Sequence, residues 1–424
     1  MGASEDSHPS LELRGWLDPA VVALALVALA SGFGQFGAVS ALGDVAKTFG
    51  RVTHGTTIAD QAGLSGTELG IGLAVLRLAS LGGLPLAGIA DRFGRRKMLL
   101  LTCALGLAFT VGAAASPGYW WFVAIFALGR PSLSATNALA QVGAAEETGS
   151  VDRAKAVALV AGGYGVGAGL TAVIHGLAGT IEFRGVFALA VVPLVGLFFV
   201  RRWLVEPRRF TIAAAAAEHP LPVIGAIGKA FRWRLLVVAA LAFAVSVVTG
   251  PANSFVFVYA NNVLGLSGTF TAVMVVVAAA FGLLGLFFGR WLADNIGRRP
   301  AAAGAMTAMV VTAVLCYSGS RVALAVGYEL AIFSASTFAP AAGALVNELF
   351  PTSVRASVAG WNVAAGVAGA VIGLVVFGSV ADVGNRFAIG ALVTFLPVIA
   401  ATALFLLLPE TRRKEPEDLW PDTP

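Results

Sequence analysis

The sequence predicts an all-α membrane protein with twelve transmembrane helices arranged as two similar six-helix halves. The first observation is composition: 58% of the 424 residues are hydrophobic and only 12% are charged, against about 25% charged in soluble domains. A soluble chain of this length needs far more polar surface to cover its core. The other two observations are twelve long apolar runs and a one-sided distribution of basic residues.

Runs of about 20 apolar residues are long enough to cross the hydrocarbon core as helices. The twelve predicted spans are Pro19–Val45, Thr67–Ala90, Met98–Ala115, Tyr119–Ala145, Ala154–Ala178, Val186–Val205, Leu235–Val258, Thr269–Ala293, Ala301–Tyr317, Val322–Val346, Val358–Val380 and Phe387–Leu408. The longest internal loop, Glu206 to Arg234, separates six spans from six. We therefore expect an N-terminal bundle in residues 1–205, a cytoplasmic linker in 206–234, and a C-terminal bundle with a cytoplasmic tail in 235–424. Within the linker, Val223–Trp233 is either an amphipathic segment at the membrane surface or a solvated connection.

The basic residues orient the predicted spans. With twelve spans, 21 of the 28 lysines and arginines fall on the side that holds both termini, and 5 fall on the other. Cytoplasmic loops carry the excess of Lys and Arg, so we expect both termini in the cytoplasm. The first apolar run is too long for a cleavable signal and has no basic lead-in or A-x-A site. It is expected to remain as the first helix.

Several other classes of function are excluded by the same sequence. The net charge of +5 comes from short basic clusters between apolar runs, a pattern that does not predict nucleic-acid binding. Cys103 and Cys316 lie inside apolar segments without metal-ligand spacing. The G-x-G-x-x-A run Gly163–Ala168 follows no strand and lies in a predicted span, so it is not a dinucleotide motif; its small residues allow close helix packing. We expect no catalytic constellation, no metal and no cofactor.

A short motif occurs once in each half. Ala90-Asp91-Arg92-Phe93-Gly94-Arg95-Arg96 follows the second span, and Ala293-Asp294-Asn295-Ile296-Gly297-Arg298-Arg299 follows the eighth. A looser pair is Glu147 with Arg153 after the fourth span and Glu348 with Arg355 after the tenth. Such internal repeats are typical of transporters whose two halves rock about a central site.

These motifs resemble the major facilitator superfamily. The motif at Asp91 is similar to the loop that this family carries between helices 2 and 3. Gly129-Arg130, the run Glu348–Arg355 and Pro409-Glu410-Thr411-Arg412-Arg413 are similar to the sugar-porter and metabolite:proton symporter branches. The resemblance covers the whole chain and implies the fold of that family, a solute carrier rather than an enzyme, a plasma-membrane location and a monomer. The chain departs from the family where Ala87 and Arg290 replace a glycine of the motif.

The resemblance also implies a cytoplasmic gate, a set of charged residues that hold the halves together when the transporter closes on that side. Ion pairs at a wet surface are individually weak, which suits contacts that must break in every cycle. The expected gate residues are Asp91, Arg92, Gly94, Arg95, Arg96, Glu147, Arg153, Asp294, Gly297, Arg298, Arg299, Glu348 and Arg355.

Two arginines lie near the predicted middle of the membrane. At about 1.5 Å per residue, Arg130 is about 16 Å into the fourth span and Arg77 about 15 Å into the second. Charged groups at this depth normally face a cavity or a partner, and a guanidinium matches the geometry of carboxylate or phosphate. We expect them to bind an anionic group; the alternative is a structural arginine bonded to nearby carbonyls.

Other polar residues complete the expected site. Gln35 stands in the first span where many proton symporters of this family carry an acid, and a neutral amide can bind substrate but cannot carry a proton. Glu329 in the tenth span is the candidate for proton coupling. Asn253 and Trp361 are further candidates for substrate binding, with Asn362 and Tyr164.

The sequence therefore predicts a secondary active transporter for a small organic anion, working by alternating access. Its partners are the solute, the bilayer and, through Glu329, a proton. The first alternative is a proton-coupled efflux antiporter for lipophilic or cationic compounds, with Glu329 as the cation site. The second is a non-transporting membrane receptor. Exact substrate, direction and coupling stoichiometry stay open.

Overall fold

The computed structural model describes residues 14–149, 151–177, 182–206, 229–384, 386–414 and 419–420. These residues are almost entirely helical, and the one β-bridge found among them joins Arg14 to Thr148. The first half contains α1 (Pro19–Ser40), α2 (Leu42–Phe49), α3 (Ile58–Ala62), α4 (Gly66–Ala79), η1 (Ser80–Gly82), α5 (Gly83–Phe93), α6 (Arg95–Ala113), α7 (Tyr119–Glu147), α8 (Arg153–Leu177), α9 (Phe183–Ala188) and α10 (Val191–Val200). The second half contains α12 (Lys229–Val258), η3 (Tyr259–Val263), α13 (Gly268–Asn295), α14 (Arg298–Cys316), α15 (Arg321–Leu349), α16 (Thr352–Gly384), α17 (Phe387–Phe395) and η4 (Leu396–Leu407).

The twelve expected spans are present among the described residues. Eleven helical stretches are long and apolar enough to cross a membrane. The helix α7 is the twelfth; at 29 residues it has ample length, but it carries Arg130, Glu146 and Glu147 and is less apolar. The predicted all-helical fold is confirmed.

The glycine of each repeated motif forms the turn between two helices. Gly94 separates α5 from α6 with φ 93°, and Gly297 separates α13 from α14 with φ 128°. Side chains disfavour this backbone region, whereas glycine adopts it freely. Each glycine lets the chain reverse direction between two antiparallel helices within one residue.

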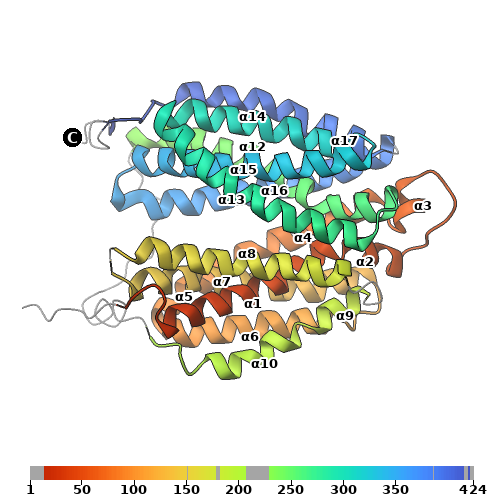
Figure 1. Cartoon of the computed structure of the whole chain (residues 1–424), viewed down its shortest axis with the longest axis horizontal. Helices are drawn as coiled ribbons and strands as arrows, with labels where there is room; N and C mark the ends of the chain where they lie inside the picture. The colour runs from red at the N-terminus through yellow and green to blue at the C-terminus, as the bar shows by residue number, and fades with distance from the viewer. Residues whose placement is uncertain are drawn as a thin grey trace, which may run out of the picture.

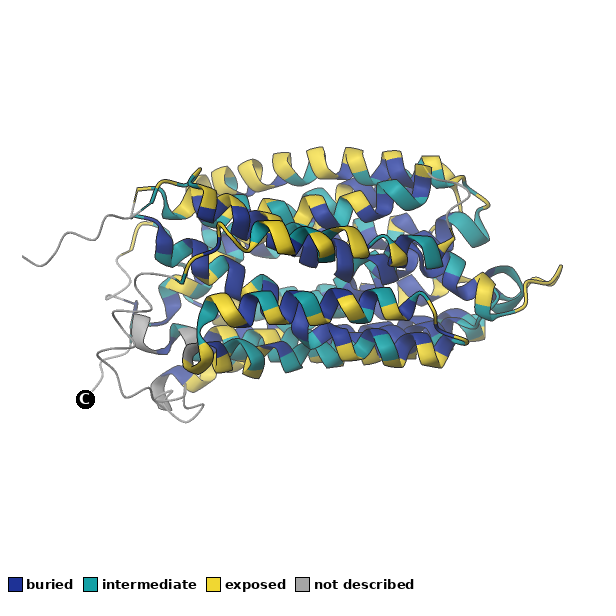
Figure 2. Ribbon diagram, turned by 90° about the horizontal axis from the view of Figure 1, so that it is seen from below, coloured by how far each residue is buried: buried dark blue, intermediate teal, exposed yellow. Residues whose placement is uncertain are grey.

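The two halves lie side by side as two layers of long, roughly parallel helices (Figure 1). Buried residues run along the helix faces that pack against one another, and exposed residues run along the outer helix faces (Figure 2). Many of those exposed residues are large and apolar, including Phe287 (73% exposed) and Leu406 (71% exposed). A surface of this kind is suited to lipid rather than water.

Among the described residues, the hydrogen bonds that join the two halves all lie at one end of the molecule. We call this the Asp382 end; it holds α2, α3 and the start of α4 (Figure 1). The opposite end, where α5 meets α6 at Arg95, is called the Arg95 end. Hydrogen bonds between the halves join Asp382 to Gly66 and Thr67, and Asn262 to the carbonyls of Gly43 and Ala62.

The predicted division into a first bundle, a linker and a second bundle stays a prediction, and residues 207–228 of the linker lie outside the described residues. The described part of Val223–Trp233 begins at Lys229 and is the first turn of α12. In this segment the chain therefore continues directly into the seventh span.

Candidate functional site

A cavity of about 70 Å³ lies between the two halves, near the middle of the helices. The first half contributes Gln35, Arg77, Arg130 and Tyr164, and the second half contributes Asn253. Four of the five predicted substrate-binding residues, Gln35, Arg77, Arg130 and Asn253, therefore share one cavity. They come from four different helices: α1, α4, α7 and α12.

A buried polar network fixes one of the two arginines. Arg130 is 8% exposed, and its Nη1 donates to Gln35 Oε1 at 3.1 Å. The Gln35 amide in turn donates to Ser31 Oγ and to the Leu133 carbonyl. The Arg130 guanidinium also lies 5.9 Å from the centre of the Phe126 ring. Gln35 thus acts as a positioning residue for Arg130, with both ends of its amide already engaged.

Arg130 keeps free hydrogen-bonding capacity all the same. Its Nε is buried and has no hydrogen-bond partner among the described residues. A guanidinium carries five N–H donors, and the bonds to Gln35 use only Nη1. The remaining donors are available to a ligand in the cavity.

The second arginine joins this cavity to a larger one. Arg77 also lines a cavity of about 380 Å³, together with Ser246, Thr249 and Gly250 of α12 and Asn362 of α16. The Ser80 hydroxyl donates to the Arg77 backbone carbonyl, but no hydrogen bond or ion pair to the Arg77 guanidinium is found among the described residues. Its guanidinium is therefore the least satisfied cation of the central region.

The electrostatics of this region favour an anion. No aspartate or glutamate lines either cavity, whereas two arginines do. An unpaired cation at membrane depth costs several kcal/mol unless a partner or water-filled cavity compensates. A carboxylate or phosphate that binds between Arg77 and Arg130 supplies that partner with the planar geometry that guanidinium prefers.

Two predicted residues lie away from these cavities. Trp361 is 41% exposed and lines none of the cavities described here, whereas the adjacent Asn362 does. Glu329 lines a separate apolar groove between α13 and α15, with Val326 and Leu330. At about 100° per residue, those two residues point away from the buried Tyr328, so this groove opens on the outer face of the second half.

The charged residues of the repeated motif form their contacts within each half. Arg95 pairs with Glu146, and Arg298 pairs with Glu348 at 2.8 Å. Arg14 pairs with Glu147 at 3.0 Å.

Two further carboxylates cap the helices that follow the motif. Glu206 accepts the backbone N–H groups of Arg95 and Arg96. Glu410 accepts those of Arg298 and Arg299, both at 3.0 Å. A carboxylate at a helix N-terminus satisfies free N–H groups and complements the helix dipole.

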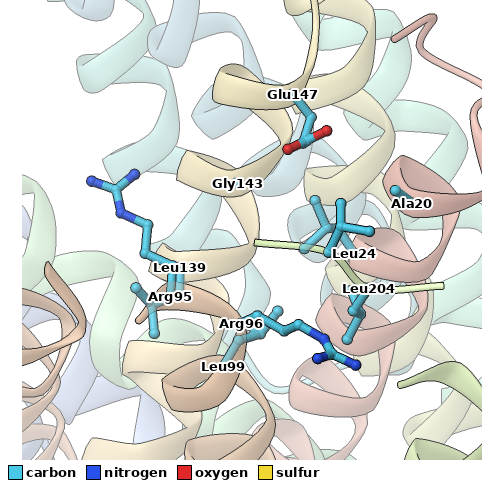
Figure 3. A pocket seen from close by; sticks show the side chains of 10 residues that line it. Ala20, Leu24, Arg95, Arg96, Leu99, Leu139, Gly143, Glu147 and Leu204 are labelled. Atoms are coloured by element: carbon cyan, nitrogen blue, oxygen red, sulfur yellow. The ribbon is translucent and has the colours of Figure 1, made fainter. Parts of the chain in front are cut away.

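Figure 3 shows this region in the first half, where the guanidinium groups of Arg95 and Arg96 point away from each other and Glu147 lies on a third side. The space between them is only about 10 Å³, which is about the volume that one water molecule needs. This is a structural charge cluster and not a solute site.

Where their side chains are described, no contact between the halves is found for the other expected gate residues in this conformation. Arg92 is exposed, Asp294 lies 3.9 Å from Arg290 of its own helix, and Arg355 Nε donates to the Phe350 carbonyl. The buried Nε of Arg153 has no hydrogen-bond partner among the described residues. The side chain of Asp91 lies outside the described residues. The closed gate at the Arg95 end therefore stays a prediction for another conformation.

The opposite end is closed by contacts that sequence reasoning missed. Asp382 Oδ1 accepts the N–H of Gly66 at 2.7 Å, and Oδ2 accepts the N–H and hydroxyl of Thr67 at 2.7 and 2.6 Å. Glycines allow this approach: a Cβ at Gly70 would lie 2.5 Å from the Leu374 carbonyl oxygen. The central cavities are thus closed toward the Asp382 end.

Comparisons with known proteins agree with this architecture. The family model described as Major Facilitator Superfamily matches residues 24–291 and 270–421. The chain belongs to the major facilitator superfamily. A Haemophilus influenzae protein named as a metabolite transport protein is 28% identical over 354 residues, which cover 79% of this chain and 85% of that protein. The ectoine/proline transporter of Corynebacterium glutamicum is 26% identical over 376 residues, or 79% and 73% of the two chains.

Solved structures of the superfamily share the fold. The inward-open xylose transporter from E. coli matches with a TM-score of 0.73 at 19% identity, covering 95% of this chain and all of that one. A bacterial homologue of the lysosomal transporter Spinster, inward-facing and occupied, matches with a TM-score of 0.71 at 15% identity, covering 95% and 98%. As a member of the superfamily, the protein is a membrane transporter for small solutes and not an enzyme.

Within this superfamily protein, the sequence motifs missed the residues whose partners are distant in the chain. The sequence motifs assigned no role to Asp382, and Glu206 was only the first residue of the predicted linker. Glu146 rather than Glu147 is the counterpart of Glu348, because it pairs with the motif arginine of its half. The one sequence feature that points to these caps is the Gly-Arg-Arg run, which occurs in both halves. It suggests that each half caps the helix after the motif in the same way.

Proposed function

We propose that the protein carries a small organic anion across the plasma membrane by alternating access, with the anionic group bound between Arg77 and Arg130. This proposal rests on the pair of arginines that line the central cavities, which are closed toward the Asp382 end. No aspartate or glutamate among the described residues lines these cavities. The Arg130 guanidinium is positioned by Gln35, and the Arg77 guanidinium has no partner among the described residues. Together the two guanidinium groups form a site for a carboxylate or phosphate.

The proposed orientation places the Arg95 end in the cytoplasm, because 21 of the 28 basic residues fall on that side and 5 on the other, and cytoplasmic loops carry the excess of Lys and Arg. The described conformation then faces inward. In the outward-facing state the Asp382 contacts break and the motif residues at the Arg95 end, Asp91 and Arg92 among them, hold the halves together. The protein is proposed to act as a monomer.

The efflux alternative is weaker on geometric grounds. An efflux carrier for cations requires a carboxylate in the central cavities through which the cation passes. Glu329 instead faces a groove on the outside of the second half. A proton could still enter through Glu329, since its Oε2 has no hydrogen-bond partner among the described residues. Coupling through Glu329 is thus a separate proposal from anion binding.

The test is a stability screen of purified protein with carboxylates, phosphates, sugars and lipophilic cations. A ligand that prefers the folded state raises the apparent melting temperature. We expect a subset of carboxylates to stabilise the wild type and to lose this effect in Arg77→Gln and Arg130→Gln. Stabilisation by cations alone, removed by Glu329→Gln, would instead support the efflux carrier.

A further inference from the structure

A third cavity, of about 390 Å³, lies in the second half between α12 and α15 and is open along one side, where exposed residues of α15 line it. We call it the apolar crevice. Its lining is dominated by apolar side chains, and asparagines supply the only polar ones. The lining residues used below are Leu241, Phe338, Ala342, Gly343, Phe405 and Asn362.

The apolar crevice borders the central region. Asn362 lines both the crevice and the cavity that contains Arg77. Three residues of α15, spaced four apart, are exposed where they line the crevice: Ala339, Gly343 and Asn347. Residues four apart lie on one helix face, so α15 presents a face of small or short side chains to open space.

A cavity of this size and lining needs an explanation. Protein interiors are close-packed, with few voids larger than a water molecule, and a strongly apolar space is poorly hydrated. Leu241 and Phe405 are 5% and 2% exposed, so ordinary core residues form its wall. An apolar guest entering from the central cavity would gain the burial that these walls offer.

We propose that the apolar crevice receives the hydrocarbon body of an amphipathic organic anion whose charged group binds at Arg77 and Arg130. This inference rests on the proposed function and narrows its substrate class. The favoured substrates are carboxylates with an alkyl or aryl body, and polyhydroxylated acids are disfavoured because their hydroxyls would lose hydrogen bonds in the crevice. Asn362 lies at the junction, where a polar group next to the carboxylate can be accepted.

The test measures the affinity of straight-chain monocarboxylates from acetate to octanoate for the purified protein. Each methylene that enters the crevice should tighten binding about fourfold, the equivalent of about 0.8 kcal/mol per buried CH₂. Gly343→Phe should flatten this dependence for the longer acids and leave acetate within about twofold, because a Cβ at Gly343 meets nothing within 4 Å and the ring can occupy the crevice.

The matched control is Gly304→Phe in α14, where a Cβ also meets nothing within 4 Å and which lines none of the three cavities. It should retain the full dependence on chain length. Arg77→Gln should weaken all the acids by a similar factor and keep the dependence.

The outcomes separate the two proposals. Binding of the acids without any dependence on chain length overturns the crevice assignment and leaves the anion site intact. A dependence that Gly343→Phe and Gly304→Phe change equally also overturns it, because detergent partitioning or a global effect would then be the cause. Absence of binding by every acid overturns the proposed function, and the crevice assignment with it.

Discussion

Asp382 of the second half binds Thr67 of the first half through both the backbone N–H, at 2.7 Å, and the hydroxyl, at 2.6 Å. The same carboxylate accepts the N–H of Gly66, so it caps the N-terminus of α4 from across the interface. Hydrogen bonds to a charged group contribute about 1.5–3 kcal/mol each, and these exist only while the halves meet at this end. The Asp382 carboxylate therefore stabilises the present conformation relative to the one open at the Asp382 end.

Asp382→Asn should shift the population toward the conformation open at the Asp382 end. An amide lacks the charge that favours a helix N-terminus, so we expect the reaction of a cysteine at Ala38, in the cavity wall, with a thiol reagent added from the Asp382 side to be about tenfold faster. Glu68→Gln is the matched control, since Glu68 caps the same helix from within the first half. Equal rates in wild type and Asp382→Asn would show that the capping does not set the equilibrium.

Gly70→Ala should act in the same direction by crowding. The added Cβ would lie 2.5 Å from the Leu374 carbonyl oxygen of the other half, a clash that only separation of the halves relieves. Gly165→Ala has open space around its Cβ and should leave the accessibility of the Ala38 position unchanged. If both variants behave alike, the close approach of α4 and α16 is not specific to this conformation.

Gln35→Glu should weaken anion binding by about tenfold or more. The new carboxylate would stand where Gln35 Oε1 now lies, 3.1 Å from Arg130 Nη1, and would neutralise the charge that attracts the ligand. Ser31→Ala removes a neighbouring hydrogen bond without adding charge and should weaken binding far less. Titration of a stabilising carboxylate into each variant measures the difference, and unchanged affinity in Gln35→Glu would remove Arg130 from the site.

Glu329→Gln should leave anion affinity within about twofold of wild type. Its side chain lines the groove between α13 and α15 and none of the central cavities. The same titration tests this, with Arg77→Gln as the variant that must lose affinity. A large loss in Glu329→Gln would mean that the groove and the central cavity are energetically linked.

The Glu410 cap predicts a dependence of stability on pH. Burial alone would raise the pKa of Glu410, but four backbone N–H bonds, from Arg412, Arg298, Arg299 and Thr411, outweigh it and hold the pKa below the ordinary 4.5. A carboxyl whose pKa is lowered on folding stabilises the fold at higher pH, and this contribution is lost as the pH falls from 4.5 through the lowered value. Glu410→Gln should lower the melting temperature by a few degrees at pH 7 and by less near pH 3.

The control for this prediction is Asp152→Asn, because Asp152 is partly exposed and its ion pair joins it only to the nearby Lys155. Such a pair contributes little to stability. A melting temperature of Glu410→Gln that equals wild type at pH 7 would contradict the cap.

The sequence predicted the spans, the two halves and the repeated motif, because these depend on local apolar length and short-range spacing. It also brought Gln35, Arg77, Arg130 and Asn253 together, because depth along each span follows from the rise per residue. It could not predict which way a side chain faces. Glu329 and Trp361 have suitable depth, but helical phase directs them away from the cavities.

The sequence also could not predict contacts between the halves. Asp382 and Thr67 are 315 residues apart, and under the proposed alternating access they meet in only one of two conformations. The break after Ser40 and the short helix α2 were also missed, since the predicted first span ran on through the start of α2 to Val45.

The most direct test of the central claim is counterflow in proteoliposomes loaded with a carboxylate that stabilises the purified protein. We expect external labelled carboxylate to accumulate transiently with wild type and with Glu329→Gln. Arg77→Gln and Arg130→Gln should abolish the accumulation while remaining folded. Undiminished counterflow in both arginine variants would contradict the assignment of the anion site.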